Sequence, residues 1–256
     1  MKIGCFTLAF NQGLYLQSAI NSVVNQTNLD EYYIYNPGST DNTSAILMKN
    51  SSNLTEIYVA SDLGPSDGLN VGLQKIQSEI FYYLNADDCA LPGAFSYVSS
   101  YFEDNPDCDV LYGGIEIIDT SGLVVRTLPP IKFTLKGYAY RYSVIYQQAT
   151  FFRRSCLKQV KFNLENRTCW DGEFIVDLAL AGFKFHKTNK VLGQFRIYPD
   201  SITGSGRLKE QIKIDHRRIA KKILGRELRN SEVAYGLVIG KLQALFRKLV
   251  SLKSDF

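Results

Sequence analysis

Apolar and polar residues follow two different periods in the first half of the chain. Residues 2–9 and 80–84 are short apolar runs, a pattern typical of strands that are buried in a sheet. A helix is predicted over residues 14–26, and its apolar face carries Leu16, Ile20, Val23 and Val24. More strands are predicted at residues 31–36 and 54–60, and more helices after residue 39, over residues 67–77 and from Pro92 to Asn105. This alternation predicts a parallel sheet with helices on both faces.

The pattern changes after Asp109. Residues 110–128 look like a hairpin that turns at Asp119 to Gly122, residues 146–154 like another strand, and residues 171–182 like a helix that ends at a glycine. A mixed half therefore follows a parallel half, and the predicted fold class is α/β. We divide the chain into one domain over residues 1–206, with halves 1–108 and 109–206, and a tail over residues 207–256.

Composition agrees with a soluble globular protein, because 45% of the 256 residues are hydrophobic and 21% are charged. No apolar run is long enough to span a bilayer, and the N-terminus is interpreted as a strand rather than a signal peptide. Five cysteines without a C-x-x-C pair indicate reduced thiols in a cytoplasmic protein.

The tail is basic and predicted to be helical. It holds 13 of the 29 Lys and Arg residues but only 5 of the 25 Asp and Glu residues. Two apolar stripes run through it: Leu208, Ile212, Ile219 and Ile223, then Tyr235, Val238, Leu242, Leu245 and Leu249. Such helices suit an anionic membrane surface, or they pack on the rest of the chain or on a second subunit in a homodimer. Nucleic acid is excluded as a partner because the main body is acidic and has no binding motif.

Polar residues gather where the predicted parallel strands end. Thr7 and Asn11, residues 36–41, residues 62–70, and Asp87 with Asp88 follow four successive strands. Ligands of open α/β sheets bind at this edge, so we expect these loops to form one crevice. The phosphate-binding motifs G-x-G-x-x-G and G-x-x-x-x-G-K-[ST] do not occur where they would be needed, which disfavours dinucleotide redox chemistry and P-loop hydrolysis.

Asp87 and Asp88 are adjacent carboxylates at the end of a buried strand. Two such groups repel each other and resist desolvation, so they require a positive charge nearby. Carboxylates without neighbouring histidines suit Mg²⁺ or Mn²⁺ shared with phosphate oxygens, so we expect the charge to be a metal ion that binds with a nucleotide. The alternative is that the pair caps the helix that Pro92 opens.

Several segments together carry a resemblance. They are "TLAFNQGLYLQSAINSVVNQT", "YNPGSTDNT", "DLGPSDGLNVGL", "YLNADDCALPGAF", "QQATFFRRS", "WDGEFIVDLALAG" and "FRIYPDSIT". In order and spacing they resemble family 2 glycosyltransferases with the GT-A fold, most of all bacterial enzymes that build surface polysaccharides. The resemblance covers about the first 200 residues, and several segments in register are more specific than any one motif.

The resemblance implies a role for individual residues. The donor-binding residues expected from it and from the polar loops are Thr7, Phe10, Asn11, Asn36, Asp67, Asn70 and Asp87. Thr7, Phe10 and Asn36 would line the base pocket, Asp67 would contact the nucleotide-sugar and Asp87 the ribose. Asp88 would hold the metal, and Asp171 stands where the family places its catalytic base.

Other residues keep two interpretations. Asp171 also fits a helix-capping pattern, and Glu173 is a second carboxylate close enough to act as base. Gln148 either contacts the acceptor or closes a surface strand, and Trp170 either stacks on a sugar or packs in the core. Three residues depart from the family pattern: Asn36 replaces an aspartate, Phe10 stands where tyrosine is common, and Tyr198 replaces a histidine near the metal.

The expected function is therefore an inverting, metal-dependent transfer of a sugar from a nucleotide-sugar to a glycan acceptor, lipid-linked, at the cytoplasmic face of the membrane. A UDP-sugar is favoured as donor, with dTDP- and GDP-sugars as alternatives. The rival functions are a catalytically silent module that binds nucleotide-sugars or glycans, and a nucleotidyltransferase.

Overall fold

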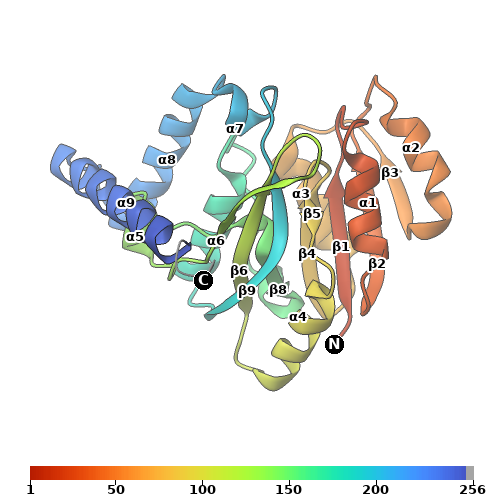
Figure 1. Ribbon diagram of the computed structural model, residues 1–256, viewed down its shortest axis with the longest axis horizontal. Helices are drawn as coiled ribbons and strands as arrows, with labels where there is room; N and C mark the ends of the chain where they lie inside the picture. The colour runs from red at the N-terminus through yellow and green to blue at the C-terminus, as the bar shows by residue number, and fades with distance from the viewer. Residues whose placement is uncertain (252–256) are drawn as a thin grey trace.

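The computed structural model of the chain describes residues 1–251, without the side chains of residues 202–203 and 245–251. One twisted sheet runs through the middle of the molecule, and the C-terminal helices project from one side of it (Figure 1). Its strands are β1 (Ile3–Leu8), β2 (Leu29–Asn36), β3 (Glu56–Val59), β4 (Ile80–Asn85), β5 (Cys89–Ala90), β6 (Val110–Ile118), β7 (Val124–Leu128), β8 (Thr150–Arg153) and β9 (Phe185–Arg196).

The sheet has a parallel half and a mixed half, as the sequence predicts. Its strand order is β3-β2-β1-β4-β8-β6-β9-β5, and β7 pairs with β6 outside this path. The first four strands of the order are parallel to one another, whereas β8 is antiparallel to both of its neighbours. Strand β9 returns parallel to β6 and ends beside the carboxyl end of β4. The expected α/β class is confirmed.

Helices cover both faces of the sheet. In the described residues they are α1 (Leu16–Val24), α2 (Thr43–Lys49), α3 (Pro65–Lys75), α4 (Ala94–Asp104), α5 (Leu135–Ala139), α6 (Trp170–Leu180), α7 (Ile202–Ser205), α8 (Lys209–Leu224) and α9 (Asn230–Ser251). Helices α1, α2 and α4 share one apolar cluster with the sheet, and α3 and α6 share the other. The central strand β4 contributes alternate residues to both clusters, which explains its unbroken apolar run.

Most predicted elements occur with shifted ends. The hairpin of β6 and β7 is confirmed, and its turn is closed by the Asp119 N–H, which donates to the Leu123 carbonyl at 3.0 Å. The strand expected over residues 146–154 is shorter, because residues 147–149 form a 3₁₀ turn before β8. Strand β9 and helix α5 have no counterpart in the sequence prediction. Because β9 is half exposed along most of its length, it lacks the apolar run that marks a buried strand.

The two C-terminal helices differ in how they meet the rest of the chain. Helix α8 packs on α5 and α6, with Ile219 fully buried. Helix α9 instead exposes Tyr235, Val238 and Leu242, whereas Leu245 and Leu249 lie outside the described side chains. The packing interpretation therefore holds for the first apolar stripe, and the second stripe is open on its described part. In residues 1–251 no helix has the length and apolar character that crossing a membrane requires.

Candidate functional site

The loops after β1 and β2 are bonded to each other at the edge of the sheet. The Asn11 N–H donates to Ser39 Oγ at 3.0 Å, and the Thr40 N–H donates to Asn11 Oδ1 at 2.9 Å. The Gly13 N–H donates to Asp41 Oδ2 at 2.9 Å. The expected convergence of these two loops is therefore confirmed. Phe10 lies at their tip with 56% of its surface exposed, which leaves its ring free to contact a ligand.

Two residues expected in the base pocket lie beneath this surface. Thr7 is fully buried, and its hydroxyl lies 3.2 Å from the Tyr32 hydroxyl. Asn36 is also buried, and its carbonyl oxygen accepts hydrogen bonds from the backbone N–H groups of Gly38 and Ser39 at 3.2 and 2.8 Å. Asn36 thus holds its own turn, as an Asn at a strand end often does, and the contact of these two side chains with the base stays a prediction.

The loop after β3 brings a second pair of carboxylates to the same edge. Asp67 lies in the first turn of α3 and accepts a hydrogen bond from the Leu63 N–H at 3.1 Å. Burial, followed by the charges of Asp62 and Asp67, raises the pKa of Tyr35 to about 12, so the three side chains lie close together. Asp67 is half-buried and stays a candidate ligand of the donor.

Asn70 has a structural role in addition to the donor contact predicted for it. Its side-chain amide donates to the Phe162 carbonyl at 2.9 Å and accepts from the Phe162 N–H at the same distance. Both polar atoms of the side chain thus connect α3 to the segment before α6, and the donor contact of Asn70 stays a prediction.

Asp88 is completely buried, and both of its oxygens are occupied. Oδ1 accepts from the Arg196 N–H at 2.9 Å and Oδ2 from Gln148 Nε2 at 2.8 Å, with Asn85 Nδ2 at 3.4 Å. Burial and the neighbouring Asp87 raise the pKa of Asp88 well above its usual range. The role of Asp88 as metal ligand stays a prediction, and an ion at this carboxylate would have to replace one of these hydrogen bonds. Gln148 orients Asp88 in this structure, and its contact with the acceptor also stays a prediction.

Asp87 is the more accessible carboxylate of the pair. Its Oδ2 accepts from the Tyr198 hydroxyl at 3.0 Å, while Oδ1 has no side-chain partner among the described residues. Burial raises the pKa of Asp87, and the Tyr198 hydrogen bond and the Arg196 charge oppose that rise. The Tyr198 hydroxyl also lies 3.4 Å from Gln12 Nε2, so it joins the ends of β1, β4 and β9.

Arg196 brings a positive charge near Asp87, where it is one of the causes that oppose the rise in the pKa of that carboxyl on burial. Its side chain is 4% exposed, and its Nε donates to the Asp87 carbonyl at 3.0 Å. Its Nη1 donates to the Asp119 carbonyl at 2.7 Å, and the guanidinium lies 4.7 Å from the centre of the Tyr15 ring. Sequence analysis expected only a metal ion here. The signal it missed is a basic residue at a strand end inside the segment "FRIYPDSIT".

A divalent ion here would depend on few protein ligands. Within residues 1–251 there is no group of three or more His, Cys, Asp or Glu side chains able to hold a metal ion. Mg²⁺ and Mn²⁺ are nevertheless bound by one or two carboxylates when substrate phosphates complete the coordination. Asp87, with one oxygen that no side chain holds, fits that donor set.

Asp171 lies in the first turn of α6, where it has no side-chain partner among the described residues. Its burial raises its pKa, against backbone hydrogen bonds that lower it. After burial, the Asp171 charge is the next cause that raises the pKa of Tyr83, so α6 begins within electrostatic reach of β4. Trp170, next to it, is half-buried and packs against the apolar cluster of α3 and α6.

Glu173 is the centre of an ion-pair cluster. It is 1% exposed and accepts from Arg218 at 2.5 and 2.6 Å and from Lys222 at 2.7 Å. Although burial raises its pKa, these bonds and those from Asn163 and Asn166 outweigh burial and lower the pKa to about 2. A carboxylate held by two cations is a poor proton acceptor, so these contacts favour a structural role, and the catalytic role of Glu173 stays a prediction.

Replacing Glu173 with glutamine should therefore affect stability. We expect the free energy of unfolding at pH 7 to fall by about 3 kcal/mol, because two cations lose a buried partner. The native pKa lies below the ordinary value of 4.5, so this stabilisation is complete above pH 4.5 and is lost as the pH falls toward 2. Urea denaturation at several pH values measures the difference between variant and wild type.

Glu56→Gln is the matched control for this variant. Glu56 pairs with Lys75 at 2.9 Å on the surface, so its loss should cost about 0.5 kcal/mol. Equal effects of the two variants would contradict the role of Glu173 as the link between α6 and α8.

Comparison with known proteins gives one family and one fold. The model of the family described as "Glycosyl transferase family 2" matches residues 5–162. An uncharacterized glycosyltransferase of Methanocaldococcus jannaschii is 24% identical over 205 residues, which cover 77% of this chain and 70% of that protein. Other curated relatives are longer, and the chain spans 20–45% of their length.

Two solved structures illustrate the similarity in fold. Residues 1–349 of TarS from S. aureus, in complex with UDP-GlcNAc, give a TM-score of 0.70 at 20% identity and cover 94% of this chain and 70% of that one. A mannosyltransferase from Pyrobaculum calidifontis, in complex with GDP-Man and Mn²⁺, gives 0.66 at 12% identity and covers 92% and 68%. The fold of this chain thus belongs to a known architecture.

Proposed function

The chain belongs to glycosyl transferase family 2, and we propose that it moves a sugar from a nucleotide-sugar donor to a hydroxyl of a glycan acceptor, with inversion at the anomeric carbon. The observation that carries the proposal is that two carboxylates, Asp87 and Asp171, each keep an oxygen that no described side chain holds. Asp87 follows β4 beside Arg196, and Asp171 lies in the first turn of α6 without a side-chain partner among the described residues. Asp87 is suited to bind the donor, and Asp171 is suited to take the proton of the acceptor hydroxyl.

Asp171 is the proposed general base. Attack by an acceptor hydroxyl requires that its proton be removed as the new bond forms, and a single displacement then inverts the sugar. A base needs a free oxygen and a pKa nearer to neutrality than an ordinary aspartate has. Asp171 has both properties, because no described side chain holds it and burial raises its pKa.

Asp87 is the proposed ligand of the donor and of a Mn²⁺ or Mg²⁺ ion. A divalent ion, when bound, neutralises the charge that develops on the diphosphate leaving group. The residues of this chain position the donor: Tyr198 and Arg196 hold Asp87 in place, and the exposed ring of Phe10 faces the base. Asp67 is proposed to contact the nucleotide-sugar. Support for a metal comes from the Mn²⁺ in the Pyrobaculum mannosyltransferase structure.

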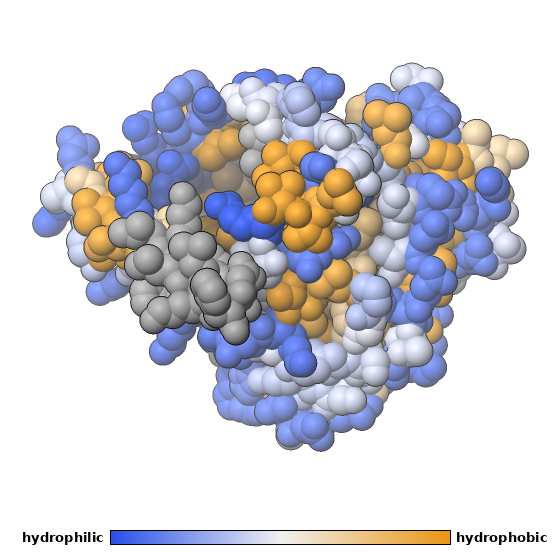
Figure 2. Space-filling view, viewed as in Figure 1, coloured by the Kyte–Doolittle hydropathy of each residue, from blue (hydrophilic) through white to orange (hydrophobic). Residues whose placement is uncertain are grey.

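The acceptor is proposed to enter from the side of the C-terminal helices. Figure 2 shows the surface hollowed between α8 and the β6–β7 hairpin, whose tip exposes Leu123, Val124 and Val125. The described part of α9 adds Tyr235, Val238 and Leu242 to the exposed apolar surface. An apolar margin with basic residues suits a lipid-linked acceptor at an anionic membrane surface, which we propose is the cytoplasmic face.

A thermal-shift screen tests the donor part of the proposal. Purified protein is combined with UDP-, dTDP-, GDP- and CMP-sugars, each with Mn²⁺ and with EDTA. A ligand present at 100 times its Kd stabilises the folded state by about 2.7 kcal/mol. We therefore expect the nucleotide-sugars of one nucleobase to raise the melting temperature in the presence of Mn²⁺. We favour UDP-sugars, because a UDP-GlcNAc complex is known for TarS, which has the same fold.

If none of the donors raises the melting temperature, the result contradicts the proposal that the chain is a glycosyltransferase. A second function, a catalytically silent module, has one observation in its favour, since Tyr198 occupies an oxygen of Asp87. A donor that binds with equal affinity in Mn²⁺ and EDTA and is never transferred would favour this module.

A further inference from the structure

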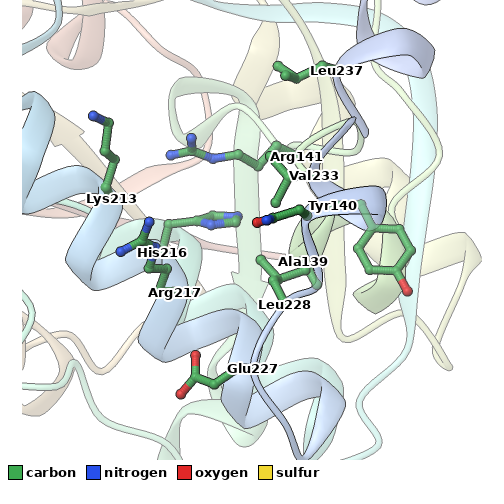
Figure 3. A pocket seen from close by; sticks show the side chains of 11 residues that line it. Ala139, Tyr140, Arg141, Lys213, His216, Arg217, Glu227, Leu228, Val233 and Leu237 are labelled. Atoms are coloured by element: carbon green, nitrogen blue, oxygen red, sulfur yellow. The ribbon is translucent and has the colours of Figure 1, made fainter. Parts of the chain in front are cut away.

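A pocket of about 440 Å³ lies outside the proposed donor site, between α5, α8 and α9 (Figure 3). One wall is the segment Ala139–Arg141 at the end of α5, and the opposite wall is α8 with Lys213, His216 and Arg217. Residues from the start of α9 close it, among them Val233 and Leu237. The pocket joins the domain of residues 1–206 to the basic tail.

Helix α9 is fixed firmly enough to form a wall. The Tyr140 hydroxyl donates to Glu232 at 2.9 Å, and Arg226 donates to the same carboxylate at 2.9 Å. The rings of Tyr140 and Tyr235 meet edge to face at 6.2 Å. A Cβ atom at Gly236 would lie 1.8 Å from the Tyr140 carbonyl oxygen, so only glycine permits this approach. The pocket is therefore built by specific contacts.

The charge of the pocket is predominantly positive. Figure 3 shows the charged ends of Arg141, Lys213 and Arg217 directed to one side of it. Within the described chain, neither arginine forms an ion pair with a carboxylate, and Glu227, the one acidic residue of the lining, is paired with Lys221 at 2.9 Å. Two exposed arginines without partners can bind an anion at little cost in desolvation.

The other side of the pocket is apolar. Leu228, Val233 and Leu237 lie opposite the charged groups in Figure 3, and Leu237 has 59% of its surface exposed. His216 does not add charge, because burial and Arg141 lower its pKa to about 4, and its Nε2 donates to the Tyr138 carbonyl at 3.2 Å. An anionic group and an apolar chain can thus occupy the pocket together.

The pocket adjoins the proposed base. Tyr138, one residue before the pocket wall, packs so closely on α6 that a Cβ atom at Gly172 would lie 2.0 Å from its hydroxyl. Gly172 directly follows Asp171. The charge of Arg141 is one of the causes that lower the pKa of Cys169, against burial, which raises it. A ligand held by Arg141 therefore lies on an element that touches the start of α6.

We propose that this pocket binds the phosphate group of an amphiphilic acceptor, with the phosphate at Arg141 and Arg217 and the apolar chain along Val233 and Leu237. The inference rests on the proposed function, because it assigns the pocket to the acceptor side of that reaction. Phosphate suits paired guanidinium groups, which donate two parallel hydrogen bonds to its oxygens.

Binding of simple probes to the full chain tests the proposal without requiring transfer. Dodecyl phosphate, below its micelle-forming concentration, carries both groups, while inorganic phosphate and dodecyl maltoside carry one each. We expect dodecyl phosphate to bind at least about tenfold more tightly than either, as measured by calorimetry. Equal binding of dodecyl maltoside would overturn the phosphate site, and equal binding of inorganic phosphate would overturn the apolar part.

Variants locate the binding. Arg141→Gln and Arg217→Gln should each weaken dodecyl phosphate about tenfold, the effect of losing a charge-assisted hydrogen bond. Lys136→Gln is the matched control, since Lys136 lies on α5, is exposed and does not line the pocket. Loss of affinity in all three variants would indicate nonspecific attraction and overturn the proposal. If a nucleotide-sugar still raises the melting temperature while dodecyl phosphate fails to bind, the pocket assignment fails and the proposed function stands.

Discussion

Asp171→Asn is expected to lower the rate of sugar transfer by about 10³-fold while donor affinity stays the same, because a positioned general base contributes on the order of 10²–10⁴-fold. The asparagine keeps the size of the side chain but cannot take the proton of the acceptor hydroxyl. The rate is measured as release of nucleoside diphosphate from the donor that the thermal-shift screen identifies, with an added glycan or water as acceptor.

The pH dependence gives this prediction a second readout. A base acts only when it is deprotonated, and burial raises the pKa of Asp171. The acid limb of kcat should therefore lie above the ordinary range of an aspartate, and the slow variant should lack it. Asp177→Asn, six residues later on the same helix, makes the same change of charge away from the site and should keep most of the activity. Full activity of Asp171→Asn would exclude it as the base.

Asp87→Asn is expected to weaken donor binding in the presence of Mn²⁺ on the order of 100-fold, because the carboxylate proposed to hold the ion loses its charge. The effect should vanish in EDTA, where the wild type has lost the same contribution. Titration of the donor against both proteins, with and without the metal, measures it. Unchanged binding in every condition would remove Asp87 from the donor site.

Asp88→Asn is the matched variant, because it makes the same substitution at the adjacent residue. The amide places an N–H group opposite the Gln148 donor, so we expect a loss of about 1–3 kcal/mol in stability. Donor affinity of the folded fraction should stay near that of the wild type. If Asp88→Asn loses metal-dependent binding at unchanged stability, Asp88 holds the ion after all.

The fold follows largely from local patterns that the sequence displays. The apolar run of β4 and the amphipathic face of α1 each report burial directly, and both were predicted. Strand β9 was not predicted, because its half-exposed residues show neither an apolar run nor strict alternation. The loops that meet at the sheet edge could be foreseen, since the carboxyl ends of parallel strands always share an edge.

The roles of single residues at that edge were harder to predict. The sequence shows that Asp87 and Asp88 are adjacent, but which of them faces inward depends on partners about 60 and 108 residues away, Gln148 and Arg196. The same holds for Glu173, whose partners Arg218 and Lys222 lie 45 and 49 residues further along the chain. Such contacts between distant segments leave no periodic signal, so a motif alone does not reveal which partners hold these carboxylates.

The clamp of Arg218 and Lys222 on Glu173 also limits how this enzyme can be recombined with its relatives. Glu173 and the proposed base lie two residues apart on one helical turn, so a change in the partners of Glu173 acts directly on the turn that carries the proposed base. A chimera that grafts a foreign tail after residue 206 must bring both cations in the same register or replace Glu173 with an apolar residue. Without either change, the graft leaves an unpaired buried charge in the turn that carries Asp171.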